Sequence, residues 1–234
     1  CANNMVSILN NFKIIWIIFK FCFISVHVYL IIDISIIYEF SCHRNMRIIS
    51  GKMKGSKLFL PKNKSVRPLK DLARESIFNF LTHSNKISFE LENSNVLDLY
   101  AGSGSFGLEC LSRQANSVYF IEKDINTIEI LKKNVQKLKL INETVVLIDD
   151  VFNVIKKKLA HKIKFDLIFC DPPFKDKNIG NLIEFIFNSC LLKENGIIVM
   201  HREKKFKDKM PNSLTIIDER YYGKSKIIFG KNSL

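Results

Sequence analysis

Four consecutive residues, Asp171 to Phe174, combine an acid, two prolines and an aromatic ring. They follow the apolar run FDLIFC at 165–170, which has the length and composition of a buried strand. Neither proline can donate a backbone hydrogen bond, so the ladder of a sheet has to stop here. The sequence therefore predicts a rigid loop at the carboxyl end of a strand, carrying a hydrogen-bond acceptor and a flat ring. Loops on rigid scaffolds are frequent places for binding and catalysis.

The segment 96–107, VLDLYAGSGSFG, carries a second chemical signal. It reads as a buried strand, a glycine-rich turn and the start of a helix, whose free backbone amides can face an anionic group. Its glycines have the spacing GxGxxG, and Glu122 follows Gly102 by 20 positions at the end of the run SVYFIE. An acid at that place binds ribose hydroxyls in nucleoside-binding sheets. An NAD-dependent oxidoreductase fits these residues too, and glycines that serve only the turn are a further alternative.

Strand and helix patterns alternate from residue 96 onward, which predicts an α/β fold with a parallel sheet covered on both faces. Right-handed crossovers place the carboxyl ends of parallel strands at one edge, so the glycine loop, Glu122 and the DPPF loop should meet there. The expected strands are 96–99, 117–122, 144–148, 165–170 and 196–201, the expected helices are 105–114, 125–140, 151–161 and 179–192, and 214–222 with 224–230 form a closing hairpin.

Upstream of this pattern, the segment 46–68 alternates apolar and basic residues around Gly51 and Gly55 and predicts a short β-hairpin. A helix follows, in which the residues expected near one face are Leu69, Leu72, Ile77, Phe80 and Leu81. A polar linker spans roughly 83–95. We divide the chain into an upstream segment, 1–45, a basic hairpin and helix extension, 46–82, and a catalytic domain, 83–234.

The upstream segment contains an apolar run at 14–32 that is nearly long enough to cross a bilayer. Lys20 and His27 interrupt it, and a lysine inside a membrane span is costly. The first internal methionine that precedes globular-looking sequence is Met46. We expect residues 1–45 to lie outside the working protein, with a membrane anchor as the alternative.

The net charge is +13, and between Arg47 and Arg74 nine basic residues stand against one acid, Asp71. A second basic cluster lies at 204–209. This excess favours a polyanionic partner through phosphate neutralisation, although a solvated lysine-rich surface also explains it. The six cysteines form no CxxC pair and no histidine stands at a ligand spacing from them, so no metal site is predicted and free thiols in a reducing compartment are expected.

The chain resembles class I S-adenosylmethionine-dependent methyltransferases that act on exocyclic amino groups. The resemblance lies in the segment DLYAGSGSFGLE, in the acids after the second and third strands, and in DPPF after the fourth strand. The segment RIISGKMKGSKLFLP, with RPLKDLARESIFNFL after it, is similar to the RsmD-like family, which methylates N2 of a guanine in bacterial 16S ribosomal RNA. The resemblance covers Met46 to about Gly230. It implies a Rossmann-like sheet of seven strands, mostly parallel with an antiparallel last strand, plus a small N-terminal β-hairpin and helix extension.

The resemblance also implies roles for individual residues. In the catalytic loop, the carboxylate and a nearby backbone carbonyl accept hydrogen bonds from the amine, and the ring stacks on a base drawn out of its helix; the residues are Asp171, Pro172, Pro173 and Phe174. Those expected to bind S-adenosylmethionine are Asp98, Ala101, Gly102, Ser103 and Gly104 (methionine portion), Glu122 (ribose) and Asp150 (adenine), with Asp149 as an alternative to Asp150. An ordinary helix cap also explains Asp150.

The residues expected to contact RNA are Arg47, Lys52, Lys54, Arg67 and Arg74, with Glu75 paired to an arginine of the helix. A surface salt bridge is the alternative for the last three. The histidines, His201 among them, show no nucleophile–base pattern and receive no role.

The implied activity is methylation of one 16S guanine by a monomeric cytoplasmic enzyme that acts on a partly assembled small subunit and has no stable membrane partner. A DNA adenine or cytosine amino-methyltransferase usually adds a target-recognition domain, for which this chain has no room. A protein-glutamine methyltransferase usually has Asn at the position of Asp171. A non-catalytic RNA-binding module is favoured by charge alone.

Overall fold

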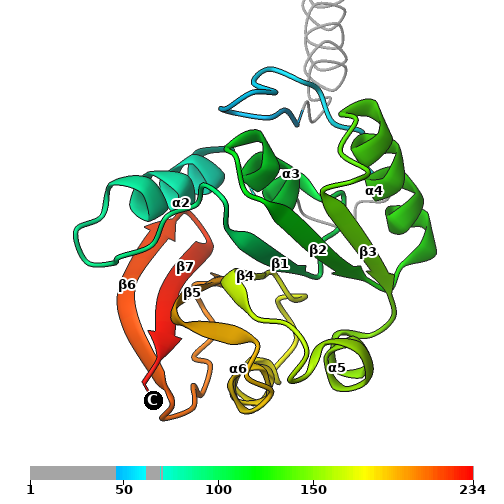
Figure 1. Cartoon of the computed structure of the whole chain (residues 1–234). Coiled ribbons are helices and arrows are strands. Elements are labelled where there is room, and N and C mark those ends of the chain that lie inside the picture. The colour runs from blue at the N-terminus through cyan, green and yellow to red at the C-terminus, as the bar shows by residue number, and fades with distance from the viewer. Residues whose placement is uncertain (1–45, 62–68, 70, 234) are drawn as a thin grey trace, which may run out of the picture. The chain divides into compact units, whose positions relative to one another are not determined.

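The structure, a computed structural model, describes residues 46–61, 69 and 71–233. Within them lies one seven-stranded sheet in the order β3-β2-β1-β4-β5-β7-β6 (Figure 1). The five strands β3 to β5 in this order are parallel, whereas β7 is antiparallel to both of its neighbours, β5 and β6. This confirms the predicted Rossmann-like class I methyltransferase fold. The strands are β1 (Asn95–Leu99), β2 (Ser117–Glu122), β3 (Thr144–Ile148), β4 (Phe165–Cys170), β5 (Leu192–Glu203), β6 (Leu214–Tyr222) and β7 (Ser225–Asn232).

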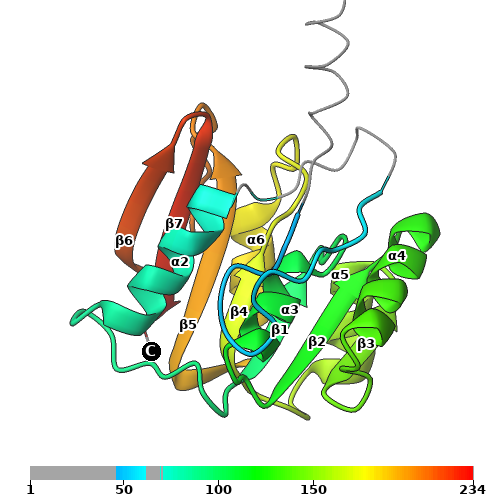
Figure 2. The same ribbon diagram turned by 90° about the horizontal axis from the view of Figure 1, so that it is seen from above.

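Helices cover both faces of the sheet (Figure 2). One face carries α2 (Asp71–His83), α3 (Ser105–Ser112) and α4 (Ile125–Lys137), and the other carries α5 (Val151–Val154), the π-helical turn η1 (Ile155–Leu159) and α6 (Ile179–Asn188). Successive residues of a strand point to opposite faces, so Val96 belongs to the first apolar core and Leu97 to the second. A sheet buried on both sides explains the nearly continuous apolar runs in the sequence.

Most element boundaries lie within three residues of the prediction, and the larger differences are at α6, β5 and α5. Helix α6 ends at Asn188 instead of residue 192, and Cys190 has a left-handed φ of 53°. Strand β5 begins at Leu192, because that residue pairs with Phe165, and polar residues at 193–195 conceal this start in the sequence. The expected helix at 151–161 is the short α5 followed by the π-helical turn.

The basic segment 46–61, called the basic loop from here on, folds back on itself as a minimal hairpin with one antiparallel bridge, Arg47 to Lys57. Backbone hydrogen bonds run from the amides of Ile48, Gly55 and Leu58 to the carbonyl oxygens of Ser56, Ile48 and Met46, at 3.0, 2.9 and 2.8 Å. The turn residues Gly51 and Gly55 do have left-handed φ angles of 82° and 85°. A Cβ on Gly51 would lie 1.9 Å from the carbonyl oxygen of Ser112, so only glycine fits against α3 at this point.

Acceptor groups of α3 bind the backbone amides at the turn of the basic loop. The Glu109 carboxylate accepts hydrogen bonds from the amides of Ile49 and Ser50 at 2.7 and 2.9 Å. The Ser112 carbonyl accepts one from the Lys52 amide at 2.8 Å. Glu109 is fully buried, so these bonds fasten the basic loop to the body of the fold.

Helix α2 buries Ala73, Ile77, Phe80 and Leu81 against the sheet. The prediction that Leu72 lies on this face is wrong, because Leu72 is 67% exposed. At 100° per residue, a face centred on Ile77 includes positions 73, 80 and 81 and leaves 72 outside it.

Residues 45–234 form one compact unit, within which the basic loop shares an apolar core with the sheet through Met46, Ile48 and Leu58. The predicted boundaries at 45 and 82 stay predictions. Residues 1–45, with their apolar run, lie outside the described residues. In the part of the chain that is described, none of the helices has the length and hydropathy of a membrane-spanning segment.

The third glycine of GxGxxG supplies a stability test. A Cβ on Gly107 would lie 2.4 Å from the Phe120 ring and 2.6 Å from Val118 Cγ1, both on β2. We expect Gly107→Ala to lower the free energy of unfolding by about 1–3 kcal/mol through overpacking. Urea denaturation measures it. Asn126→Ala, at an exposed position of α4, is the control and should change it by under about 0.5 kcal/mol. An equal effect of both substitutions would contradict the close helix–strand packing.

Candidate active site at the carboxyl edge of the sheet

The glycine loop begins directly after β1 with left-handed φ angles at Tyr100 (58°), Gly102 (57°) and Gly104 (79°). A left-handed tyrosine is energetically unfavourable and is held only where its surroundings enforce it. Glu122, at the end of β2, accepts a hydrogen bond from the Gly102 amide at 3.0 Å. Its other carboxylate oxygen accepts from the amides of Lys123 and Asp124 at 2.8 and 2.9 Å. The structure therefore brings Glu122, the residue predicted to bind ribose, into contact with the glycine loop.

Asp98 lies beneath this loop, on β1, and is 1% exposed. Its carboxyl group accepts a hydrogen bond from the Gly107 amide at 3.0 Å and so ties β1 to α3. Burial raises the pKa of Asp98 well above its ordinary value, and the nearby carboxylates of Asp171 and Glu122 raise it further. A role toward the methionine portion of a cofactor stays a prediction.

The two acids after β3 make different contacts. Asp150 caps α5 by accepting a hydrogen bond from the Phe152 amide at 3.1 Å. Asp149 accepts from the Asn153 side chain at 3.1 Å and from the Asp150 amide at 2.7 Å, and these bonds lower its pKa. The hydrogen bond from the Phe152 amide thus supports the alternative that Asp150 is a helix cap. The structure does not choose between the two acids as adenine ligands.

The DPPF loop lies at the same edge of the sheet as the glycine loop. Leu99 pairs with Cys170 across β1 and β4, and with Ile121 across β1 and β2. The Asp171 amide lies 3.4 Å from the Leu99 carbonyl oxygen that it donates to. The predicted convergence of these loops is therefore confirmed as geometry, whereas the roles of their residues stay predictions.

His201, to which the sequence assigned no role, holds the Asp171 side chain. Its Nδ1 lies 2.9 Å from Asp171 Oδ1, and its Nε2 lies 2.9 Å from the hydroxyl of Ser225 on β7. An ionised carboxylate only accepts hydrogen bonds, so Nδ1 carries the proton in this contact. The ring is buried, and the Phe174 ring meets it edge-on with centroids 5.2 Å apart. Pairing of Met200 with Cys170 is what puts His201 beside Asp171.

Arg202 fixes the chain that follows Asp171. It is 1% exposed and forms a bidentate ion pair with Asp208, with N–O distances of 2.9 and 2.8 Å. Its guanidinium also donates to the carbonyl oxygens of Asp176 at 2.7 Å and Pro173 at 3.4 Å. Arginine forks of this kind combine strength with a fixed direction. Arg202 therefore holds the DPPF loop from within the protein.

The residues predicted to contact RNA divide into three groups. Arg47, Lys52 and Lys54 are exposed on the basic loop. Arg67 lies outside the described residues. The prediction for Arg74 is wrong, because its side chain is fully buried and donates to the Arg47 carbonyl oxygen at 2.6 Å.

Arg74 thus fastens the basic loop from within and does not meet a ligand. Its carboxylate partner is Asp71, at 3.0 Å, one turn before it in α2. The sequence predicted that Glu75 pairs with an arginine of this helix, whereas Arg74 pairs with Asp71. Glu75 itself is exposed.

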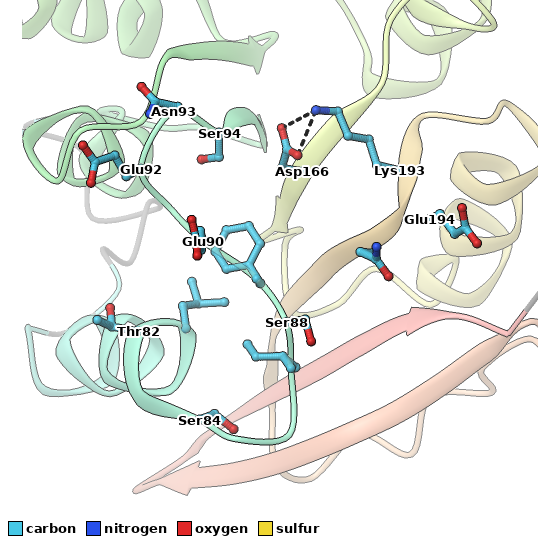
Figure 3. A pocket seen from close by; sticks show the side chains of 14 residues that line it. Thr82, Ser84, Ser88, Glu90, Glu92, Asn93, Ser94, Asp166, Lys193 and Glu194 are labelled. Carbon is cyan, nitrogen blue, oxygen red and sulfur yellow. Dashed lines mark hydrogen bonds and ion pairs between the residues drawn. The ribbon is translucent and has the colours of Figure 1, made fainter.

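A cavity of about 710 Å³ lies at the opposite, amino edge of the sheet (Figure 3). Polar side chains line much of it, among them Glu90 and Glu92 of the linker. The ion pair between Asp166 and Lys193, with an N–O distance of 2.8 Å, joins the starts of β4 and β5 at its wall. The cavity is therefore separate from the loops described above.

Comparison with known proteins gives consistent similarities. The model of a family described as Conserved hypothetical protein 95 matches residues 46–231. Ribosomal RNA small subunit methyltransferase D of Haemophilus influenzae is 34% identical over 178 residues, which are 76% of this chain and 89% of that protein. The solved structure "Putative methyltransferase yhhF" from Escherichia coli has a TM-score of 0.69 at 26% identity, covering 81% of this chain and 99% of that one.

A more distant solved structure, SMU.776 in complex with SAH, has a TM-score of 0.53 at 15% identity, covering 74% of this chain and 58% of that one. At this identity the likeness shows a shared fold alone, and the bound SAH belongs to that protein.

The Arg202–Asp208 pair can be tested by removing one or both charges. We expect Arg202→Met to lower the free energy of unfolding by about 3–5 kcal/mol, because Asp208, whose side chain is 5% exposed, is left buried and uncompensated. Arg202→Met combined with Asp208→Leu should recover much of this loss, because no buried charge remains. Urea denaturation of the three proteins measures both values. A double variant as unstable as the single one would contradict the buried ion pair.

The raised pKa of Asp98 predicts a pH dependence of stability. Below about pH 4 the carboxyl is protonated in both states, and its contribution to stability is fully present. As the pH rises toward the raised pKa, the unfolded chain releases the proton that the folded chain keeps, so this contribution is lost. Asp98→Asn removes the titration, and the variant should gain stability relative to the parent as the pH rises above about 4.

Urea denaturation across the pH range checks this prediction. Asp124→Asn is a control of opposite sign, since hydrogen bonds from Thr127 lower the pKa of Asp124. Parallel stability curves for the parent and Asp98→Asn would contradict a raised pKa at this position.

Proposed function

The chain belongs to the family described as Conserved hypothetical protein 95 and is a methyltransferase of the RsmD type; from this premise, we propose that it transfers a methyl group from S-adenosylmethionine to N2 of a guanine in 16S ribosomal RNA. The observation that carries the proposal is the Asp171 carboxylate, held by His201 at the same sheet edge as the glycine loop. The name of the Haemophilus influenzae relative supports an RNA substrate.

The residues at this edge fit the cofactor by the chemistry of their groups. The glycine loop, Ala101 to Gly104, brings backbone close to the site, and the carboxylate of Glu122 is bonded to that loop and can accept ribose hydroxyls. Asp150, or Asp149 beside it, can accept from the adenine amino group. When bound, S-adenosylmethionine supplies a methyl group on a positively charged sulfur. Asp98 ties β1 to α3 beneath the glycine loop.

The guanine amine is a poor nucleophile, because its lone pair is delocalised into the ring, and Asp171 increases its reactivity. The carboxylate accepts a hydrogen bond from the N2 amino group, directs the nitrogen at the methyl carbon and stabilises the positive charge that develops on it. S-adenosylmethionine would supply the methyl group, and Asp171 would take up the N–H proton that the amine loses. His201 keeps the carboxylate oriented through its Nδ1–H.

The rest of the loop holds the base in place. Pro172 and Pro173 restrict the backbone, and Arg202 anchors the carbonyl of Pro173. Phe174 stacks on a guanine drawn out of its helix. Much of the rate gain then comes from holding amine and methyl group in reacting position.

The RNA is bound through its phosphates by Arg47, Lys52 and Lys54 of the basic loop. Sixteen residues, 46–61, are a small surface for reading sequence, so the folded RNA of a partly assembled small subunit presents the target. The enzyme acts as a monomer in the cytoplasm. An NAD-dependent oxidoreductase has no use for the DPPF loop and its His201 contact.

Methylation of under-modified 30S particles tests the proposal. We expect the wild-type protein to transfer one labelled methyl group per particle to N2 of a guanine, identified by mass mapping of the RNA. A short naked oligonucleotide should be a poor substrate. Isothermal titration should detect S-adenosylhomocysteine binding but no NADH binding. Methyl transfer to DNA, or NADH binding alone, would refute the proposed function.

The role of Asp171 has a matched test on β4. Asp171→Ala should lower kcat by about 10²–10³-fold, the scale for losing one preorganised electrostatic contact, and leave S-adenosylhomocysteine affinity within about tenfold. Asp166→Asn, an acid at the other end of the same strand, should keep kcat. Equal losses of kcat and cofactor affinity in Asp171→Ala would mean that Asp171 is structural.

A further inference from the structure

Phe59 is an exposed aromatic residue at the end of the basic loop. Its exposed fraction is 49%, and it is the only phenylalanine among the exposed large hydrophobic residues of the described part of the chain. Exposure of a large apolar ring is compatible with an ordinary surface, so the surroundings of the ring have to decide whether it serves a partner.

The backbone of Phe59 is held on both sides by one buried side chain, Asn134 of α4. The Phe59 amide donates to Asn134 Oδ1 at 2.7 Å, and the Asn134 amide group donates to the Phe59 carbonyl oxygen at 3.1 Å. Asn134 is fully buried. The ring therefore projects from a fixed point, and little conformational entropy remains to be lost when a partner binds.

The same Asn134 amide group connects this point to the cofactor loop. Its nitrogen also donates to the Ser103 carbonyl oxygen, at 3.0 Å. Phe59 and the glycine loop thus share one side chain, which fixes their separation. The backbone of Phe59 is thus linked through one side chain to the backbone of Ser103 in the glycine loop.

One lysine ammonium lies against the ring. The Lys137 ammonium donates to the Lys57 carbonyl oxygen at 2.6 Å and lies 4.8 Å from the centroid of the Phe59 ring. The basic loop, residues 46–61, contains no acidic residue. An aromatic ring among fixed positive charges matches an RNA strand, whose bases stack and whose phosphates are anionic.

We propose that Phe59 stacks on an unpaired base of the RNA near the methylated guanine, with Lys137 on the adjoining phosphate. Asn134 positions this platform relative to the cofactor loop. The inference rests on the proposed function and adds a base contact outside the DPPF loop. It distinguishes Phe59, which binds a base, from Arg47, Lys52 and Lys54, which neutralise charge.

Two readouts test the platform, KM for 30S particles and affinity for a single-stranded RNA oligonucleotide measured by fluorescence anisotropy. Phe59→Leu keeps the apolar bulk and removes the aromatic face. It should raise both KM and Kd by about 5- to 150-fold, the effect of losing one base stack, with kcat within about twofold. Phe59→Trp should retain tight binding. Affinity for S-adenosylhomocysteine should be unchanged in both variants.

Tyr221→Leu is the matched control, because Tyr221 is also exposed, at 52%, and has a lysine ammonium 5.5 Å from its ring centroid, on β6. It should leave KM and Kd unchanged. Lys137→Met should reduce the slope of log affinity against log salt by about 0.7, whereas Phe59→Leu should not alter it.

The outcomes separate the two proposals. Unchanged oligonucleotide affinity in Phe59→Leu overturns the platform even when methyl transfer is normal. Failure of the wild-type protein to methylate 30S particles overturns the proposed function, and the anisotropy measurement still decides on Phe59. Equal weakening by Phe59→Leu and Tyr221→Leu would show nonspecific apolar adhesion and would also overturn the platform.

Discussion

Direct pairing of β1 with β4 is the constraint on which the site depends. Because the two strands are parallel and neighbours, their carboxyl ends coincide, and the loops that follow them meet. One loop carries backbone amides and glycines, and the other carries the acid and prolines of DPPF. The pairing of these strands therefore places the Asp171 carboxylate at the same sheet edge as the glycine loop. A shift of one residue in this register would turn Asp98 from the face that meets α3.

A second group of contacts fastens the basic loop to this framework. Buried polar side chains from three helices, Arg74 of α2, Glu109 of α3 and Asn134 of α4, bond its backbone. Arg74 and Glu109 also pair with the side chains of Asp71 and Arg113, while the lysines at 52, 54 and 57 of the loop remain exposed. The basic loop is thereby held by buried contacts, which salt screens little.

The sequence was sufficient for features that depend on local pattern and on chain order. Strand–helix alternation predicted the sheet, and the residues after each strand predicted the shared edge. The contacts of His201 and Arg202 could not be predicted, because their partners come from β7 and from loops whose positions only the folded sheet defines. The prediction that Arg74 contacts RNA was wrong for a related reason. Its type and its basic neighbours suggest a phosphate ligand, and only burial against the loop carbonyl shows the internal role.

The position of β7 has a consequence for how the protein matures. This strand is the last in chain order, yet it lies inside the sheet between β5 and β6. Its Ser225 completes the hydrogen-bonded series that reaches Asp171 through His201. During translation β7 can pair only after residues 225–232 have left the ribosome, so the contacts from Ser225 through His201 to Asp171 form after the other six strands have been synthesised.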